Sequence, residues 1–202
     1  MIKAPKLYIE INKSINFSKM ELVKNYLKDL SNSLNEFNII EIEKIAQVFL
    51  NARNDNKNIY VFGNGGSGST ASHMVCDILK GCSYGKEKRF KITCLNDNIP
   101  TLLAYSNDIS YDVVFLEQLK NFINPGDVVI GISGSGNSIN VINAIKYANL
   151  NNCITIGFTG FDGGLLKKEA TYSLNALVND MQITEDIHVI ALHILYKLLS
   201  NK

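Results

Sequence analysis

The chain has 202 residues, 46% of them hydrophobic, and this length and composition suit one globular domain with a sizeable core. Its 20 basic and 19 acidic residues give a formal net charge of +1, so no bulk electrostatic field attracts nucleic acid or a membrane surface. No apolar run reaches the ~20 residues of a transmembrane helix, and the first residues lack the apolar segment of a signal peptide.

In chain order, the first segment is residues 1–17, which show no clear period and are interpreted as an N-terminal arm. Helical periodicity follows over 18–35 and 38–54. Short apolar runs then alternate with helical patterns. Strands are expected at 58–62, 90–95, 127–132, 153–158 and 171–177, and helices at 67–80, 110–122, 138–149 and 182–200.

This alternation of strands and helices predicts a single α/β domain over residues 18–202. Short apolar strands separated by helices are typical of a parallel sheet that is covered on both faces. In such domains ligands bind at the carboxyl ends of the strands. Two turns rich in glycine and serine fall at that edge of the predicted sheet.

The more informative turn is Gly131 to Ser138, GISGSGNS, which joins an apolar strand pattern to a helical one. Its glycines let the backbone approach a ligand, and its three serines can donate hydrogen bonds to oxygens. The helix N-terminus adds free N–H groups and the positive end of a dipole. We therefore expect an anion-binding cup here, whose candidate residues are Ser133, Gly134, Ser135 and Ser138.

The second turn, Gly63 to Thr70, has a similar composition and contains the candidate ligand residues Asn64, Gly65, Gly66 and Ser67. Two such turns in one short chain suggest a small phosphorylated metabolite. A dinucleotide is the alternative, because the turn matches G-x-G-x-x-G and Asp97 follows the second strand. The two helices before the first strand and the separate serine cup count against that alternative. No Gly-Lys-Ser/Thr ends the turn, so a P-loop is excluded.

Candidate acid–base and metal-binding side chains lie on two predicted helices, which carry all three histidines of the chain. His73 and Asp77 are four residues apart, which places them on one helix face. Glu185 and His193 lie on the last helix, but their spacing of eight residues pairs them less well. Asn107 with Asp108 forms either a helix cap or a contact to sugar hydroxyls.

The four cysteines have no Cys-x-x-Cys spacing that would suggest a metal or redox site. Without an export signal, we expect reduced thiols and a cytoplasmic location. Cys76, Cys82, Cys94 and Cys153 are therefore not assigned a function.

Together and in this order, these motifs resemble the phosphoheptose isomerases of the sugar isomerase (SIS) superfamily. The resemblance spans about residues 20–200 and includes the two glycine-serine turns, His73, Asn107-Asp108, Thr159 to Gly164 and the EDIH motif at Glu185. It implies a flavodoxin-like sheet with N-terminal helices and a homotetramer whose sites lie between subunits. It also implies conversion of sedoheptulose 7-phosphate into D-glycero-D-manno-heptose 7-phosphate through an enediol, for lipopolysaccharide core or capsule synthesis.

Residue by residue, the resemblance implies one zinc ion per subunit, bound by His73, Asp77, Glu185 and His193. Asp77 and His193 would also act as base and acid. The residues that would bind substrate are Asn64, Gly65, Gly66, Ser67, Asn107, Asp108, Ser133, Gly134, Ser135, Ser138 and Glu185.

Three residues depart from the family pattern. Asp77 stands where glutamate is usual, Glu185 where glutamine is usual, and Gly134 where threonine or serine is usual. A non-catalytic relative that senses a sugar phosphate or binds a replication initiator is therefore kept as the alternative function. The presence of both histidines and both carboxylates favours the isomerase.

Overall fold

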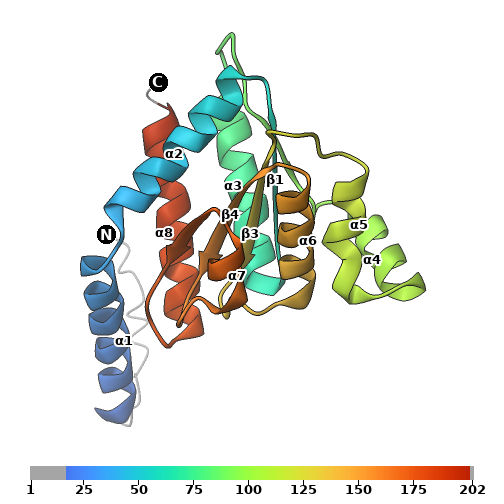
Figure 1. Cartoon of the computed structure of the whole chain (residues 1–202). Helices are drawn as coiled ribbons and strands as arrows, with labels where there is room; N and C mark the ends of the chain where they lie inside the picture. Colours follow the sequence, from blue (N-terminus) through green and yellow to red (C-terminus); the bar gives the residue numbers. More distant parts are fainter. Residues whose placement is uncertain (1–16, 201–202) are drawn as a thin grey trace, which may run out of the picture.

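A computed structural model describes residues 17–200. The chain forms a five-stranded sheet with the strand order β2-β1-β3-β4-β5. Figure 1 shows this sheet between helices. All four neighbouring strand pairs are parallel, so the predicted flavodoxin-like α/β sheet is confirmed. The strands are β1 (Asn58–Gly63), β2 (Lys91–Cys94), β3 (Val128–Ser133), β4 (Ile154–Thr159) and β5 (Tyr172–Asn175).

Eight α-helices and one short 3-10 helix, η1, surround the sheet in the described part of the chain. They are α1 (Phe17–Asn35), α2 (Ile39–Asn54), α3 (Gly65–Gly81), α4 (Ile99–Asp108), η1 (Tyr111–Val113), α5 (Val114–Lys120), α6 (Ile139–Leu150), α7 (Gly164–Glu169) and α8 (Met181–Ser200). The arm expected at residues 1–17 lies outside the described residues, apart from the start of α1.

The region between β2 and β3 differs from the prediction of one helix over 110–122. The structure has α4 before it and then divides it into η1 and α5. Asn98 caps α4 by accepting a hydrogen bond from the Thr101 N–H, and proline follows at the start of the helix. Interpreting Asn107 and Asp108 as an N-terminal helix cap was therefore wrong, because they end α4.

The start of α3 also differs, since this helix begins at Gly65 rather than at residue 67. Gly65 has a φ of +52°, a left-handed conformation that glycine adopts without a steric penalty. The chain can therefore turn sharply from β1 into α3. Gly65 and Gly66 consequently belong to the first turn of the helix, where backbone N–H groups are free to bind a ligand.

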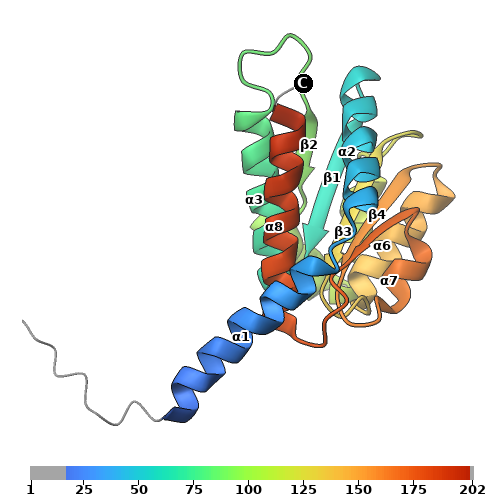
Figure 2. The same cartoon turned by 90° about the vertical axis from the view of Figure 1, so that its left-hand side faces the viewer.

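Each face of the sheet packs against its own layer of helices. One apolar cluster joins α2, α3 and α8 to strand residues such as Ile130, and a second joins α5 and α6 to residues such as Val129. These two neighbours point to opposite faces because side chains alternate along a strand. Figure 2 shows α3 and α8 together on one side and α6 with α7 on the other. This arrangement fixes α3 and α8 side by side.

Helix α1 projects away from the body of the domain, as Figure 2 shows. Its contact with α8 includes a hydrogen bond of 2.7 Å, which the Tyr26 hydroxyl donates to Asp186 Oδ2. The carboxylate of Asp186 is the main cause that raises the pKa of Tyr26 to about 12. None of the helices in the described residues is long and apolar enough to cross a membrane.

His188 connects α8 to the end of β4 inside the protein. Its side chain is buried, with the residue 1% exposed, and Nε2 lies 3.1 Å from the Thr159 carbonyl oxygen. A carbonyl oxygen can only accept, so Nε2 carries the proton. Burial lowers the pKa of His188 to about 4, because an imidazolium would lose its hydration there.

This burial predicts a pH-dependent stability. As the pH falls from about 6.5 to about 4, the unfolded chain takes up a proton at His188 that the folded chain does not. The free energy of unfolding should therefore fall by a contribution on the order of 3 kcal/mol over this window. His188→Gln should remove that contribution, as measured by denaturant unfolding at several pH values. Equal pH slopes for the variant and the parent would contradict this assignment.

Candidate active site

The two glycine-serine turns come together at the carboxyl edge of the sheet and line one cavity of about 310 Å³. β1 and β3 are neighbours, so the helices that follow them, α3 and α6, begin beside each other. Of the predicted ligand residues, those that line the cavity are Asn64, Gly65, Gly66, Ser67, Ser133, Gly134, Ser135, Ser138 and Glu185. Ile132 and Met181 complete the lining.

Hydroxyl groups in the serine turn are oriented by hydrogen bonds within the turn. The Ser133 hydroxyl donates to Ser138 Oγ at 3.1 Å, and Ser135 Oγ accepts from the Asn137 N–H at 3.2 Å. Ser135 and Ser138 therefore keep their own hydroxyl protons available for a ligand. With the helix N-termini, this arrangement suits a phosphate group.

The loop after β4 and the start of α7 support the serine turn through three hydrogen bonds. Gly160 N–H donates to the Gly134 carbonyl at 2.8 Å, and Leu166 N–H donates to the Gly136 carbonyl at 2.9 Å. Leu165 N–H donates to Asn137 Oδ1 at 3.2 Å. Gly160 in the loop and Leu165 and Leu166 in α7 thus hold the candidate anion cup in shape.

The carboxylate of Glu185 lies beside the first turn of α3. A side chain added at Gly66 would collide with it, which shows how closely the two approach. The positive end of the α3 dipole favours a negative charge at this place. Glu185 thus lies at the cavity with the serine cup.

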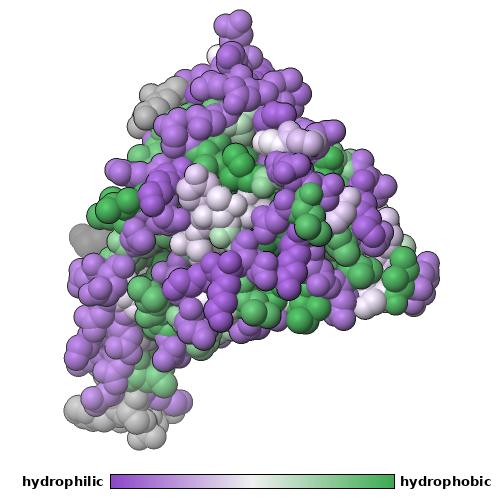
Figure 3. Space-filling model, viewed as in Figure 1, coloured by the Kyte–Doolittle hydropathy of each residue, from purple (hydrophilic) through white to green (hydrophobic). Residues whose placement is uncertain are grey.

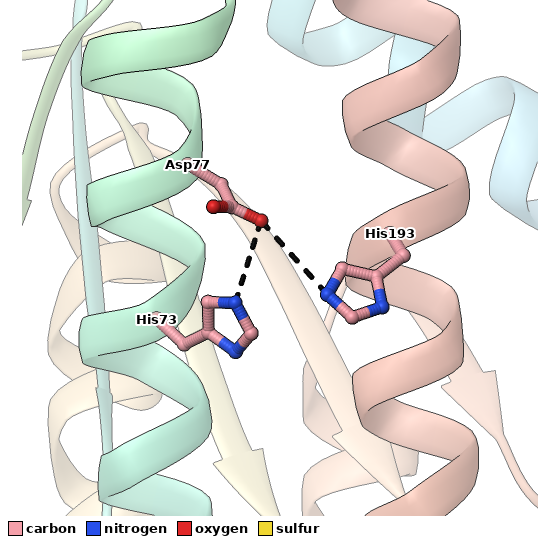
Figure 4. Close-up of side chains that lie close together, drawn as sticks. All are labelled: His73, Asp77 and His193. Atoms are coloured by element: carbon pink, nitrogen blue, oxygen red, sulfur yellow. Dashed lines mark ion pairs between the residues drawn. The ribbon is translucent and has the colours of Figure 1, made fainter. Parts of the chain in front are cut away.

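His73, Asp77 and His193 form a separate cluster between α3 and α8 (Figure 4). The Nε2 atoms of His73 and His193 lie 3.5 and 4.0 Å from the same oxygen, Asp77 Oδ2. One potential ligand atom from each residue lies within 4.8 Å of the other two. Glu185 is outside this group, so its role as a metal ligand stays a prediction.

This cluster fits a divalent metal ion. Two imidazoles and a carboxylate are donors that zinc accepts, and ligand atoms in a tetrahedral zinc site lie about 3.3 Å apart. The separations in the cluster exceed this by about 1.5 Å at most, which side-chain rotations can close. The three side chains are partly exposed. Asp77 and His193 also line a cavity of about 370 Å³ that includes Cys76, Lys80 and Lys197.

The cup and the cluster lie at different heights along the same two helices. Asp77 follows Gly66 by eleven residues on α3, an axial rise of about 16 Å. His193 follows Glu185 by eight residues on α8, an axial rise of about 12 Å. A ligand bound at both places must therefore be elongated.

Asn107 and Asp108 lie at the exposed C-terminal end of α4 and are not part of the cavity lining in the described chain. Asn107 Nδ2 donates to Asp108 Oδ1 at 2.8 Å. Their assignment to substrate therefore remains a prediction. Conversely, Tyr111 and Asn140 both bond to the side chain of Asn64. The sequence carries no signal for either contact, because the partners are 47 and 76 residues away along the chain.

Comparison with known families agrees with this geometry. A family model described as SIS domain matches residues 24–160, which is more than half of the chain. The chain belongs to the SIS domain family. The fold described above is thus that of a SIS domain.

The named relatives of this SIS domain agree with the resemblance in the sequence motifs. A "Probable phosphoheptose isomerase" of Thermoplasma acidophilum is 38% identical over 179 residues, covering 89% of this chain and 98% of the relative. The "Phosphoheptose isomerase" of Aliarcobacter butzleri is 34% identical over 162 residues, covering 80% and 85%. Phosphoheptose isomerase GmhA from Neisseria gonorrhoeae has a solved structure with a TM-score of 0.83 at 26% identity, covering 91% of this chain and 100% of that one.

The support of the serine cup can be tested at Gly136. Its φ of +66° disfavours a side chain, and a Cβ would overlap the carbonyl oxygen of Gly163. We expect Gly136→Ala to lower the free energy of unfolding by more than about 2 kcal/mol and to weaken binding of inorganic phosphate. The measurements are denaturant unfolding and a phosphate titration.

Gly85→Ala is the matched control for this substitution. Gly85 has a similar φ of +71° but open space around its Cβ position. The substitution Gly85→Ala has the penalty of a positive φ but no overlap with another atom. It should therefore lower the free energy of unfolding by about 1 kcal/mol and leave phosphate binding unchanged. Equal effects of the two substitutions would show that the contact with Gly163 does not shape the cup.

Proposed function

We propose that this SIS domain is a phosphoheptose isomerase, which converts sedoheptulose 7-phosphate into D-glycero-D-manno-heptose 7-phosphate through an enediol. The observation that carries the proposal is that α3 and α8 each contribute both to the cavity with the serine cup and, further along, to the His73–Asp77–His193 cluster. An extended seven-carbon phosphate spans about 10 Å from phosphorus to C1 by ordinary bond lengths. Contacts of about 3 Å at each end bring this to about 16 Å, which is comparable to the rise from Gly66 to Asp77 along α3.

The phosphate end of the sugar would bind in the serine cup. Ser135 and Ser138 would donate their hydroxyl protons there, and Ser133 would orient Ser138. The first turns of α3 and α6 offer backbone N–H groups. A dianionic phosphate is favoured by both helix N-termini. Anchoring the charged tail would place the carbonyl end of the sugar along the α3–α8 face, near Asp77.

The reaction requires two proton movements, and the cluster has a group for each. Asp77 would remove a proton from C1, beside the C2 carbonyl, and return it to C2 after the enediol forms. His193 would carry the proton of the O1 hydroxyl to O2, so that C1 becomes the aldehyde. Asp77 and His193 come from different helices, yet their reactive atoms lie 4.0 Å apart.

A metal ion belongs to the same proposal. His73, Asp77 and His193 would hold one zinc ion per chain. The family resemblance implies Glu185 as the fourth ligand, whose side chain would have to lean from the cup toward the cluster. When bound, zinc supplies positive charge that stabilises negative charge developing on the carbonyl oxygen.

Assembly into a homotetramer is also proposed, with sites between subunits. Apolar side chains on α1 and α4 support it, because Leu22, Leu27, Ile99 and Leu103 are exposed in the single chain. Figure 3 shows hydrophobic groups on the surface, including its lower right, where α4 and α5 lie in Figure 1. We place the enzyme in the cytoplasm, where its product would enter lipopolysaccharide core or capsule synthesis.

The direct experiment is incubation with sedoheptulose 7-phosphate, followed by NMR of the sugar carbons. The parent chain should form the aldose. Asp77→Asn should lower turnover by about 1000-fold while the sugar phosphate still binds, because the amide cannot accept the C1 proton. Asp55→Asn, at an exposed carboxylate after α2, is the control and should retain parental turnover.

Two other outcomes of this assay are informative. Binding without any turnover by the parent chain would support the non-catalytic sensor instead. Retained turnover in Asp77→Asn would remove Asp77 from the role of base. A chelator should lower turnover and added zinc should restore it, whereas unchanged turnover after complete metal removal would contradict the zinc proposal.

Ser135→Ala tests the phosphate end separately. Loss of one hydroxyl that donates to a charged group should raise KM about tenfold and change kcat little. Ser200→Ala, at the far end of α8, serves as the control and should leave both constants at parental values. An unchanged KM in Ser135→Ala would argue against the cup as the phosphate site.

A further inference from the structure

The side chain of Asn64, which lines the serine-cup cavity, is held by a network that reaches two other parts of the chain. Asn64 Oδ1 accepts one hydrogen bond from Asn140 Nδ2 at 3.0 Å and another from the Tyr111 hydroxyl at 2.8 Å. Asn64 Nδ2 donates to Asn140 Oδ1 at 2.9 Å. The amide is therefore bonded on both of its ends.

A backbone group fixes the direction of every bond in this network. Val141 N–H donates to Asn140 Oδ1 at 2.9 Å, and an N–H can only donate. This contact determines which end of the Asn140 amide is oxygen, and Asn140 is only 2% exposed. Asn140 must then present its NH₂ group to Asn64 Oδ1, so Tyr111 must be a donor as well.

Tyr111 is presented to Asn64 by a segment that is itself restrained. Ser110 Oγ caps η1 by accepting from the Asp112 N–H at 3.1 Å. Asn143 Nδ2, on α6, donates to the Asp112 carbonyl at 3.1 Å. The η1 helix thus joins α6 to the first turn of α3 through the hydroxyl of Tyr111.

The hydrogen bonds of the Asn64 side-chain amide leave one of its N–H groups without a partner among the described residues. Both lone pairs of Oδ1 accept bonds, and one of the two Nδ2 hydrogens is donated to Asn140. The remaining N–H is the only unassigned donor of this amide, and no acceptor capacity remains. A ligand in the cavity meets a donor at Asn64 and must offer an oxygen that accepts.

We propose that Tyr111 is a positioning residue, which acts with Asn140 to hold the Asn64 amide so that it donates its free N–H to an acceptor oxygen of the bound sugar phosphate. This inference rests on the proposed function for the identity of the ligand. Without the Tyr111 hydroxyl, the Asn64 amide keeps its two bonds to Asn140 but loses the bond to η1 that restrains its tilt. Its free N–H would then be directed less well at a ligand oxygen, which weakens binding.

The test is a double-mutant cycle on the dissociation constant of sedoheptulose 7-phosphate, measured by calorimetry in the Asp77→Asn background, where turnover does not interfere. Tyr111→Phe should weaken binding about fivefold, and Asn64→Ala about tenfold. Because Tyr111 acts through Asn64, Tyr111→Phe should have no further effect once Asn64 is alanine. Tyr84→Phe is the control, since Tyr84 is 82% exposed and is not part of the cavity lining in the described chain.

The inference would be overturned if Tyr111→Phe weakened binding by the same factor in the Asn64→Ala background as with Asn64 present. It would also be overturned if Tyr111→Phe bound the sugar phosphate with parental affinity. Thermal unfolding of each variant separates this role from a general loss of stability, which would lower the melting temperature without coupling the two sites in binding. Conversion of the sugar by the parent chain is measured separately. If the two substitutions are coupled in binding but the parent chain does not convert the sugar, the isomerase proposal is contradicted and the inference about Tyr111 stands. If the parent chain converts the sugar but the two substitutions have additive effects on binding, the isomerase proposal stands and the inference about Tyr111 is contradicted.

Kinetics give a second readout in a converting enzyme. With Asp77 intact, Tyr111→Phe should raise KM by a similar factor and leave kcat within about twofold, because the lost contact orients a binding group. A fall in kcat at constant KM would instead assign Tyr111 to the chemical step and overturn its role in binding.

Discussion

The site depends on the pairing of β1 with β3 at the centre of the sheet. Because these parallel strands are neighbours, Gly63 and Ile132 lie opposite each other and both glycine-serine turns leave the same edge. Two helix N-termini then point into one cavity, and their partial positive charges add. A register shift in this pair would separate the turns and remove the anion cup, although the two sequence motifs would be unchanged.

Helix α3 links the two ends of the candidate site. Its first turn contributes Gly65 and Gly66 to the cup, and its middle carries His73 and Asp77. Packing against α8 brings His193 to the same oxygen of Asp77, as Figure 4 shows. The apolar contacts between these helices and the sheet therefore set both the width of the cluster and its distance from the cup. In the proposed function, selection of an elongated ligand would follow from this helix geometry.

The sequence predicts the sheet and the cup because these depend on local patterns, namely apolar runs and glycine-serine turns between a strand and a helix. Helix α4 was not predicted because its apolar residues do not share one face: Leu102 and Tyr105 pack against the core, whereas Ile99 and Leu103 are exposed. The bond between Tyr111 and Asn64 was not predictable either, since it depends on how η1 packs against α6. The spacing of eight residues along α8 indicated that Glu185 and His193 pair poorly. In the structure Glu185 lies at the cup and His193 lies in the cluster.

The most direct test of the account is a crystal structure of the protein with sedoheptulose 7-phosphate bound. Phosphorus should lie within hydrogen-bond reach of the serine hydroxyls between Ser133 and Ser138, and C1 should lie about 3–3.5 Å from an oxygen of Asp77. A phosphate group bound elsewhere, or a sugar directed away from the α3–α8 face, would contradict the account.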